Sequence, residues 1–160
     1  MDQGLSHVDP DGRPRMVGVA GKAETLRRAR AAAEIVFSEG VLARVLSGEL
    51  PKGAVLDTAR IAGVMAAKKT AELIPLCHPL RIAEVEISFS PMGERLLGIS
   101  AVVTAVDRTG VEMEAMTAAA VAALTVYDIV KAVDRKAVVQ NLRLLEKEGG
   151  KSGPWRREEP

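Results

Sequence analysis

The sequence has few aromatic residues, one cysteine and almost no net charge, and each shortage excludes a class of protein. Aromatic residues make up 2% of the 160 residues, so a surface on which nucleotide bases stack is not expected, and we predict no nucleic-acid partner. The 22 Lys and Arg and the 21 Asp and Glu residues give a formal net charge of +1, so no overall field attracts the protein to DNA or to a membrane. Any anion site must therefore be local.

Cysteine and histidine are too few for a metal centre. Cys77 is the only cysteine, which excludes a disulfide within the chain, and a cysteine-based metal site would have to be shared between subunits. The two histidines, His7 and His78, lie far apart in the sequence. No run of about 18 apolar residues is present, and residues 1–4 do not begin a signal peptide. We therefore predict no bound metal, no membrane span and a cytoplasmic location.

The chain does have enough apolar sequence for one core. Apolar residues make up 48% of it and charged residues 27%, as in ordinary globular proteins, and the length fits a single domain over residues 1–160. Turn-forming residues fill residues 9–14 and 149–154, so we predict that residues 1–14 and 149–160 are flexible.

Strand patterns and helix patterns are grouped rather than strictly alternating, which predicts an α+β fold with an antiparallel sheet packed against helices. Residues 85–89 and 97–107 flank a turn at residues 91–94 and predict a β-hairpin. For residues 22–37, composition favours a helix whereas alternation favours a strand, and periodicity alone leaves both open. The other predictions are strands at residues 16–20 and 138–145, helices at residues 39–46 and 57–73, with Gly63 marking a break or a close contact in the second, and a helix that begins at Thr109 in a capping box with Glu112 and runs to about Val133.

The longest predicted helix carries three charged residues within an arc of about 100°, namely Glu114, Asp128 and Lys131. Asp128 and Lys131 are one turn apart, and a surface ion pair is the simplest interpretation. Glu114 and Asp128 are 14 residues apart, or about 21 Å along a helix at 1.5 Å per residue. If both belong to one small-molecule site, that site must be assembled from two subunits.

Two prolines bracket a rigid segment, residues 75–79, that presents Cys77 and His78 on opposite sides. His78 could serve as a general acid or base or as a phosphate ligand, or simply be a hydrogen-bonded loop residue. No base is apparent beside Cys77, so packing is favoured over a nucleophilic role.

Lysines near glycine and proline suggest a phosphate site. Lys52 lies between a proline and a glycine, and Lys68 lies in a predicted helix, although solvated surface is the default for each. Residues 149–153, Gly-Gly-Lys-Ser-Gly, lack the spacing of a phosphate-binding P-loop, and a proline follows them. A mobile lid that carries Lys151 is the alternative.

Taken together, these segments resemble the MoaC family, the cyclic pyranopterin monophosphate synthases. The resemblance covers nearly the whole chain, without residues 1–4 and 154–160, and its motifs are specific. The matching stretches are Met16-Val17, Lys22-Ala23-Glu24-Thr25, Thr58-Ala59-Arg60-Ile61-Ala62-Gly63, Ala66-Ala67-Lys68, Leu73-Ile74-Pro75-Leu76-Cys77-His78-Pro79-Leu80, Thr109-Gly110-Val111-Glu112-Met113-Glu114-Ala115, Ala122-Ala123-Leu124-Thr125, Tyr127-Asp128, Lys131-Ala132-Val133 and Gly149-Gly150-Lys151-Ser152-Gly153.

The resemblance implies a ferredoxin-like subunit in which residues 22–37 form a strand. It implies a homohexamer, a trimer of dimers, with sites at the dimer interface. The implied substrate is a cyclised dihydro-GTP (3′,8-cyclo-7,8-dihydroguanosine triphosphate) made by a separate radical enzyme. It would be converted to cyclic pyranopterin monophosphate with release of pyrophosphate, in molybdenum cofactor biosynthesis. The resemblance implies no resident cofactor and leaves open whether Mg²⁺ accompanies the substrate phosphates.

The resemblance also implies roles for individual residues. Asp128 would be the catalytic acid–base residue, held ionised by Lys131, and Lys52 would join them in catalysis. Met113 and Glu114 would bind the purine-derived ring from the other subunit.

The remaining implied residues bind the substrate. Leu76, Cys77 and His78 would form one wall of the pocket, and Glu112 would either help to bind substrate or cap its helix. Positive residues would neutralise the triphosphate and the departing pyrophosphate: Lys52, Lys68, Lys131, Lys147, Lys151 and Arg27.

Two other classes of protein remain open. One is a non-catalytic oligomeric domain that binds a purine nucleotide or a pterin, which would tolerate loss of Asp128 and Lys131. The other is a structural assembly module whose helix charges form ion pairs between subunits. Failure of every phosphorylated ligand to stabilise the protein would favour the structural module.

Overall fold

Residues 22–37, which the residue pattern left open between helix and strand, contain the central strand of the fold. The computed structural model describes residues 8–9, 11–50 and 53–158, and β1 spans Thr25–Val36. Ala29, Ala31 and Ile35 lie on one side of this strand, and each is 1% exposed or less. Burial of one strand face therefore outweighs the helix preference of alanine, and the strand implied by the resemblance is confirmed.

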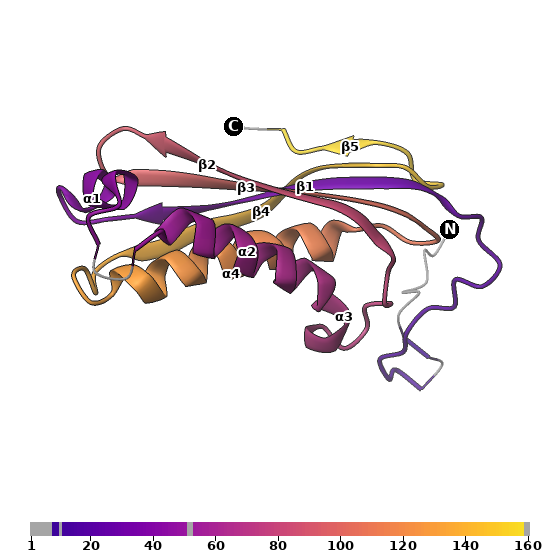
Figure 1. Ribbon diagram of the computed structural model, residues 1–160. Coiled ribbons are helices and arrows are strands. Elements are labelled where there is room, and N and C mark those ends of the chain that lie inside the picture. The colour runs from indigo at the N-terminus through magenta and orange to yellow at the C-terminus, as the bar shows by residue number, and fades with distance from the viewer. Residues whose placement is uncertain (1–7, 10, 51–52, 159–160) are drawn as a thin grey trace.

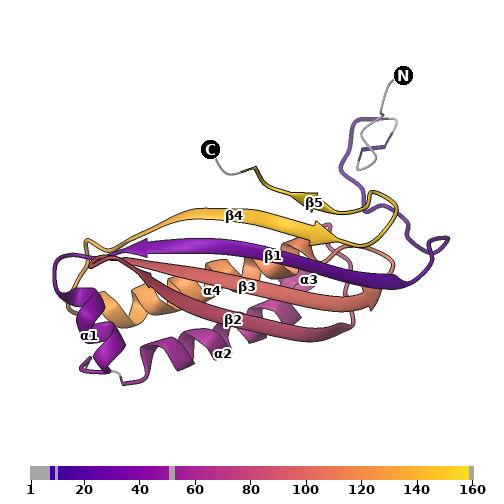
Figure 2. The ribbon, with the colours of Figure 1, turned by 90° about the horizontal axis from the view of Figure 1, so that it is seen from above.

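β1 lies inside an antiparallel sheet of strand order β2-β3-β1-β4-β5. Figures 1 and 2 show α2 and α4 covering one face of this sheet. The chain path β1-α2-β2-β3-α4-β4, with β1 and β3 innermost, is that of a ferredoxin-like α+β fold. The remaining elements are α1 (Val41–Ser47), α2 (Val55–Lys68), α3 (Thr70–Leu73), β2 (Ile82–Met92), β3 (Leu96–Asp107), α4 (Glu112–Val130), β4 (Val138–Glu148) and β5 (Trp155–Arg156).

The core forms where α4 packs against β1, β3 and α2. A row of fully buried alanines, including Ala115 and Ala118, lets these elements approach closely. A Cβ atom at Gly63 of α2 would lie 2.2 Å from Ile87 Cδ1 and 3.0 Å from the Ala118 carbonyl oxygen. Gly63 thus marks a close contact and not a break. α4 has the length and apolar composition of a membrane span, but half of that stretch is buried inside the domain, as in the core helix of a soluble protein.

Several local predictions are confirmed. β2 and β3 form the predicted hairpin, in which Val85 pairs with Val103 and Gly93 occupies the turn with a positive φ of 79°. α1 forms within one or two residues of the predicted helix and ends at Gly48. β4 confirms the last predicted strand and continues it to Glu148.

One predicted element is wrong. Residues 16–20 form no strand, because their side chains are exposed or half-buried and offer no buried face. The helical stretch predicted at residues 57–73 is confirmed, but it begins at Val55 and is divided at Lys69 into α2 and α3. The buried hydroxyl of Thr70, the first residue of α3, donates to the carbonyl oxygens of Ala66 and Ala67 at 3.2 and 3.0 Å and fixes the bend between the two helices.

The predicted capping box is also wrong. α4 begins at Glu112, not at Thr109, with Val111 as its N-cap residue and no side-chain capping hydrogen bond, and it ends at Val130. The Glu112 carboxylate instead lies against Gly110, where a Cβ atom would be 1.9 Å from Oε2. It lies 3.8 Å from Lys147 Nζ, an attraction that competes with capping.

The segment after β4 turns back onto the sheet. Residues 149–153 form the turn, and Trp155 and Arg156 then pair with Lys147 and Glu146 as β5. Glu146 accepts hydrogen bonds from Arg30 at 3.0 Å and from Arg156 at 2.8 Å. The segment therefore has defined attachments to the sheet, and its flexibility in solution stays a prediction.

Candidate active site

The residues predicted for the site divide between the two ends of α4. The helix has 19 residues, with Glu114 in its first turn and Asp128 in its last, so about 21 Å of helix separates them. We call these the Glu114 end and the Asp128 end. Figure 1 shows α4 running from the side of the molecule where α3 lies to the side where α1 lies. The predicted residue Lys52 lies outside the described residues.

Glu114 borders a small cavity where α2, α4 and the loop before β2 meet. The cavity has a volume of about 110 Å³, and Lys68 and His78 also line it. Glu114 is 3% exposed, and its burial, with the charges of Glu112 and Asp107, raises the pKa of the carboxyl to about 7. A carboxyl that titrates near neutral pH beside a lysine and a histidine is typical of a functional site.

The loop before β2 brings the predicted wall residues to this end. Leu76 is 37% exposed, whereas Cys77 and His78 are half-buried. Burial, together with the negative charge of Glu114, raises the pKa of the Cys77 thiol. Both effects favour the protonated thiol, so the structure supports packing and not a nucleophilic role for Cys77. Met113, in the first turn of α4, is 36% exposed.

Lys147 joins α4 to the C-terminal turn. Its ammonium group lies 3.8 Å from Glu112 Oε1 and donates to the hydroxyl of Ser152 at 2.5 Å. Glu112 therefore contacts a predicted phosphate-binding lysine and does not cap its helix.

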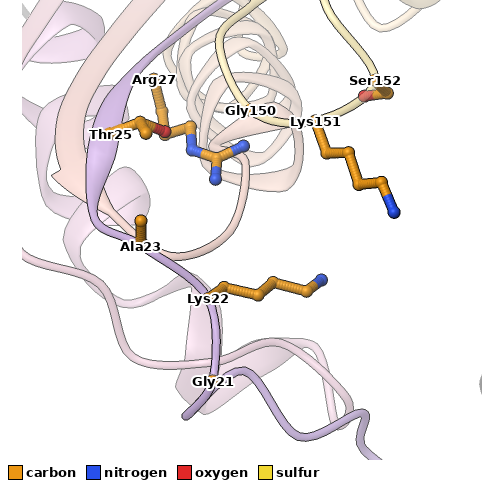
Figure 3. Close-up of a pocket in the computed structure, with 8 residues that line it drawn as sticks. All are labelled: Gly21, Lys22, Ala23, Thr25, Arg27, Gly150, Lys151 and Ser152. Carbon is orange, nitrogen blue, oxygen red and sulfur yellow. The ribbon is translucent and has the colours of Figure 1, made fainter.

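Arg27 borders another hollow at this end, which we call the Lys22 depression. Arg27 Nε and Nη2 donate to the carbonyl oxygens of Asp107 and Arg108 at 3.2 and 3.3 Å, and these bonds fix the guanidinium. The depression has a volume of about 750 Å³. Figure 3 shows Arg27, Lys22 and Lys151 facing it from different segments. Its lining residues are Gly21, Lys22, Ala23, Thr25, Arg27, Gly150, Lys151 and Ser152.

The turn that carries Lys151 is built around Arg27. A Cβ atom at Gly150 would lie 1.7 Å from Arg27 Nη1, and one at Gly149 would lie 2.0 Å from the carbonyl oxygen of Leu26. Both glycines also have positive φ angles, 93° and 78° for Gly149 and Gly150. Close approach to β1, and not the spacing of a P-loop, explains the two glycines.

Charged residues absent from the predicted set also lie at the Glu114 end. Lys22 is one, and Glu24 is a second, whose carboxylate lies 2.8 Å from Arg81 and 3.8 Å from Arg108. A further hollow of about 480 Å³ is lined by Glu24, Arg81 and Arg108, together with His78. The matching stretch Lys22-Ala23-Glu24-Thr25 was the only sequence signal for them, because neither spacing nor periodicity places a residue outside a regular element.

The Asp128 end has a different character. Lys131 Nζ donates to Asp128 Oδ1 at 2.5 Å, and the two side chains are 50% and 58% exposed respectively. The predicted ion pair is therefore confirmed, on the surface of the subunit. The structure thus brings one set of predicted residues together and leaves Asp128 and Lys131 apart from it. The set at the Glu114 end is Arg27, Lys68, Leu76, Cys77, His78, Glu112, Met113, Glu114, Lys147 and Lys151.

Within the described residues, no group of three or more His, Cys, Asp or Glu side chains is placed to hold a metal ion. The positive residues at the Glu114 end are suited to anions, which they would bind directly.

Comparison with known proteins gives a consistent result. The sequence model of the MoaC family matches residues 16–150. "Cyclic pyranopterin monophosphate synthase 3" of Mycobacterium bovis is 55% identical over 153 residues, which cover 96% of this chain and 86% of the relative. Proteins named "Cyclic pyranopterin monophosphate synthase" from Thermomicrobium roseum and Chloroflexus aggregans are 53% and 51% identical over 156 residues, which cover 97% of this chain and 94% of each relative.

Proposed function

The chain belongs to the MoaC family, and on that premise we propose that it is a cyclic pyranopterin monophosphate synthase of molybdenum cofactor biosynthesis. It converts the cyclised dihydro-GTP precursor to cyclic pyranopterin monophosphate and releases pyrophosphate. The observation that carries this proposal is the gathering of a buried carboxyl, His78 and several cations at the Glu114 end.

The chemistry of the reaction explains why both kinds of group are needed. A cyclic monophosphate forms from a triphosphate when an oxygen of the substrate attacks the α-phosphorus and pyrophosphate departs. Negative charge grows on the departing oxygens, so fixed cations stabilise the transition state. We assign this role to Lys68, Lys147, Lys151 and Arg27, and the resemblance assigns it to Lys52 as well.

Glu114 is suited to the purine-derived ring. A carboxylate accepts hydrogen bonds from the paired N–H donors of a guanine-like edge, and burial strengthens such bonds. Met113 beside it supplies an apolar contact, and Leu76, Cys77 and His78 form the opposite wall. His78 donates to phosphate or to the ring.

Asp128 acts as the acid–base residue with Lys131, and they come from a second subunit. The separation of about 21 Å along α4 supports this arrangement, because one small substrate cannot reach both ends of one helix. Met113, Leu124 and Asp128 lie along one stripe of α4 at helical spacing, and Leu124 is 57% exposed. Two copies of α4 that packed antiparallel about a twofold axis would bury this stripe and bring Asp128 of one copy to the Glu114 end of the other.

Exposed apolar residues on the neighbouring helix support the same face as the dimer contact. Ile61 and Met65 of α2 are one turn apart and are 62% and 52% exposed. Three such dimers would form the proposed hexamer. The protein is cytoplasmic in this proposal and needs no resident cofactor, and Mg²⁺ would enter only with the substrate phosphates.

The test is turnover of the purified cyclised dihydro-GTP precursor, followed by pyrophosphate release. Wild type should release pyrophosphate, and Asp128→Asn and Lys131→Ala should each be slower by about 100-fold or more, as expected for loss of an acid–base or charge-stabilising group. Glu86→Gln, an acid-to-amide change at an exposed position of β2, is the matched control and should keep full activity.

Circular dichroism must show that all the variants are folded. A well-folded wild type that releases no pyrophosphate would contradict the proposal and favour a module that binds a nucleotide or pterin without turning it over.

A further inference from the structure

We infer that Asp134 positions Lys131 for its pairing with Asp128, because the Asp134 carboxylate fixes the turn after α4 that carries Lys131. This inference rests on the proposed function, in which the pair performs acid–base catalysis, and it adds a positioning residue to that function. Asp134 lies just beyond the matching stretch Lys131-Ala132-Val133, and no pattern in the sequence singled it out. It acts through the backbone and is not itself a catalytic residue.

Asp134 carries a buried carboxylate that accepts three hydrogen bonds. It is 4% exposed. Its Oδ2 accepts from the backbone N–H of Ser38 at 2.7 Å, and its Oδ1 accepts from the Ser38 hydroxyl at 2.8 Å and from the backbone N–H of Lys136 at 3.1 Å. Burial alone would raise the pKa of Asp134, but these hydrogen bonds and the charge of Arg95 outweigh burial and hold the pKa below its ordinary value. The carboxylate therefore stays ionised and serves as a fixed acceptor.

The backbone of the turn that carries Lys131 bonds to the last turn of α4. The helix ends at Val130, and the N–H of Lys131 donates to the Tyr127 carbonyl oxygen at 2.8 Å. The N–H groups of Val133 and Asp134 both donate to the Val130 carbonyl oxygen at 2.9 Å. Helix ends fray, because their last carbonyl groups lack partners within the helix. A second attachment is therefore needed to hold the turn in one place, and the Asp134 side chain provides it.

Asp134 connects this turn to the central strand of the sheet. Ser38 lies two residues after the end of β1 and 96 residues before Asp134. Its neighbour Phe37 is 1% exposed and exchanges two hydrogen bonds with Arg95: the Phe37 N–H donates to the Arg95 carbonyl oxygen at 2.8 Å, and Arg95 Nε donates to the Phe37 carbonyl oxygen at 2.7 Å. Figures 1 and 2 show the ends of α4 and β1 on the same side of the molecule, near α1. The turn is thus anchored to the core.

Catalysis depends on where this turn lies. Asp128 is in the last turn of α4, whereas Lys131 lies one residue beyond the helix, so the turn determines the position of Lys131. The Lys131 side chain is 50% exposed, so packing within the subunit restricts it little and its backbone decides where the ammonium group can reach. A displacement of about 1 Å at a catalytic group can slow a reaction about 100-fold. An attachment that fixes the backbone of Lys131 therefore supports turnover.

The first measurement is turnover of the cyclised dihydro-GTP precursor by wild type and Asp134→Asn. Asparagine keeps the shape of the side chain but replaces one acceptor oxygen by an NH₂ group, so at least one hydrogen bond to Ser38 or Lys136 is lost. We expect kcat to fall about tenfold, less than the loss expected for Lys131→Ala. KM should change by less than about twofold, because the binding residues at the Glu114 end are unaltered. A wild-type kcat in well-folded Asp134→Asn would overturn the inference.

A double-variant cycle separates positioning from a purely structural role. If Asp134 acts through Lys131, adding Asp134→Asn to Lys131→Ala should lower kcat by less than about a further twofold, because the group that Asp134 positions is already absent. Independent effects would instead multiply, to about 1,000-fold in the double variant. That result would show that Asp134 does not act through Lys131, and the inference would be wrong.

Ser38 provides a test that does not need Asp134→Asn to fold. Ser38→Ala removes the hydroxyl that donates to Asp134 Oδ1 but keeps the backbone N–H that donates to Oδ2. We expect kcat to fall about threefold, as for the loss of one hydrogen bond of ordinary strength. Ser38→Thr keeps the hydroxyl and should retain nearly the wild-type kcat. Equal kcat values for Ser38→Ala and wild type would contradict the inference.

Glu34→Gln is the matched control, because Glu34 is also a buried carboxylate that accepts three hydrogen bonds. It is 9% exposed and accepts from Gln140, Asn141 and Arg143, which belong to β4 and not to the turn after α4. Urea unfolding should show that Glu34→Gln is destabilised as Asp134→Asn is, but its kcat should stay within about twofold of wild type. An equal fall of kcat in Glu34→Gln would show that any loss of stability slows turnover, and would overturn the positioning role.

The inference and the proposed function fail in different ways. If wild type turns over the precursor, Lys131→Ala is slow and Asp134→Asn is as fast as wild type, then Asp134 is not a positioning residue and the synthase function stands. If well-folded wild type does not turn over the precursor, the function is overturned and the positioning role is overturned with it.

Discussion

The two ends of α4 carry charged residues in opposite circumstances. At the Glu114 end, a carboxyl that is 3% exposed titrates near neutral pH among fixed cations and hollows. At the Asp128 end, a carboxylate and an ammonium group form an ion pair with about half of each side chain exposed. One end is organised within a single subunit, whereas the other presents its groups outward.

Stability explains neither arrangement. Burying a carboxyl destabilises the folded state at neutral pH, and an exposed ion pair stabilises it by about 0.2–1 kcal/mol at most. Groups that contribute so little to folding are better explained by a site that both ends share. The comparison therefore predicts that each end is incomplete without the other, and that they meet only between subunits.

The largest effect is expected when two inactive variants are mixed. If each site takes Asp128 from one subunit and Glu114 from its partner, a mixed dimer of Asp128→Asn and Glu114→Gln contains one intact site and one doubly altered site. Random assembly makes about half of the dimers mixed, so activity should return from near zero to about a quarter of the wild-type value. The measurement is pyrophosphate release after the two variants are expressed together.

Asp128→Asn mixed with Lys131→Ala is the control for that experiment. Both changes lie at the same end, so every site in a mixed dimer keeps one altered residue and activity should stay near zero. If native mass spectrometry shows mixed dimers of Asp128→Asn and Glu114→Gln but pyrophosphate release stays near zero, the two ends do not share a site between subunits.

The second prediction concerns the pH dependence of stability. The folded pKa of Glu114, about 7, lies above its ordinary value of 4.5, so the folded state holds the proton more tightly than the unfolded state. The contribution of Glu114 to the free energy of unfolding is therefore fully present below about pH 4.5, and it is lost as the pH rises through about 7. The loss should approach about 3 kcal/mol at pH 8.5, from 1.36 kcal/mol per unit. Glu114→Gln, which cannot ionise, should lack this loss.

Urea unfolding of wild type and Glu114→Gln between pH 4.5 and 8.5 tests whether stability falls with rising pH as predicted. Asp107 and Glu146, whose pKa values are lowered by their hydrogen bonds, push the other way, but both proteins contain them and their effect cancels in the difference. Parallel stability curves for the two proteins would contradict a buried, proton-holding Glu114.

The same comparison shows what sequence could and could not predict. Alternation found the β2–β3 hairpin, because one strand face is buried and the other is not. It left β1 undecided, because alanine gives little contrast between buried and exposed positions. Helical spacing placed Glu114 and Asp128 at opposite ends of one helix, which regular geometry fixes.

Local sequence patterns could not predict contacts between segments that are distant in the chain. The capping box failed because Glu112 is drawn toward Lys147, which is 35 residues further along the chain. Lys22 was missed because its neighbours in the depression, Arg27 and Lys151, include a turn from the other end of the chain. The raised pKa of Glu114 likewise depends on burial that only the fold creates.

The smallest effect is expected from the Asp128–Lys131 pair on stability. Because both side chains are about half exposed, Lys131→Ala should change the free energy of unfolding by about 0.5 kcal/mol or less, while pyrophosphate release nearly stops. Lys147→Ala, at the Glu114 end, should lower the free energy of unfolding by more, about 1 kcal/mol. The reason is that the ammonium group of Lys147 is less exposed and joins Glu112 to Ser152. Urea unfolding at one fixed protein concentration compares the two, so that subunit assembly contributes equally. A loss of about 2 kcal/mol or more in Lys131→Ala would mean that the pair holds subunits together, as in a structural assembly module, because an exposed pair within one subunit cannot contribute that much.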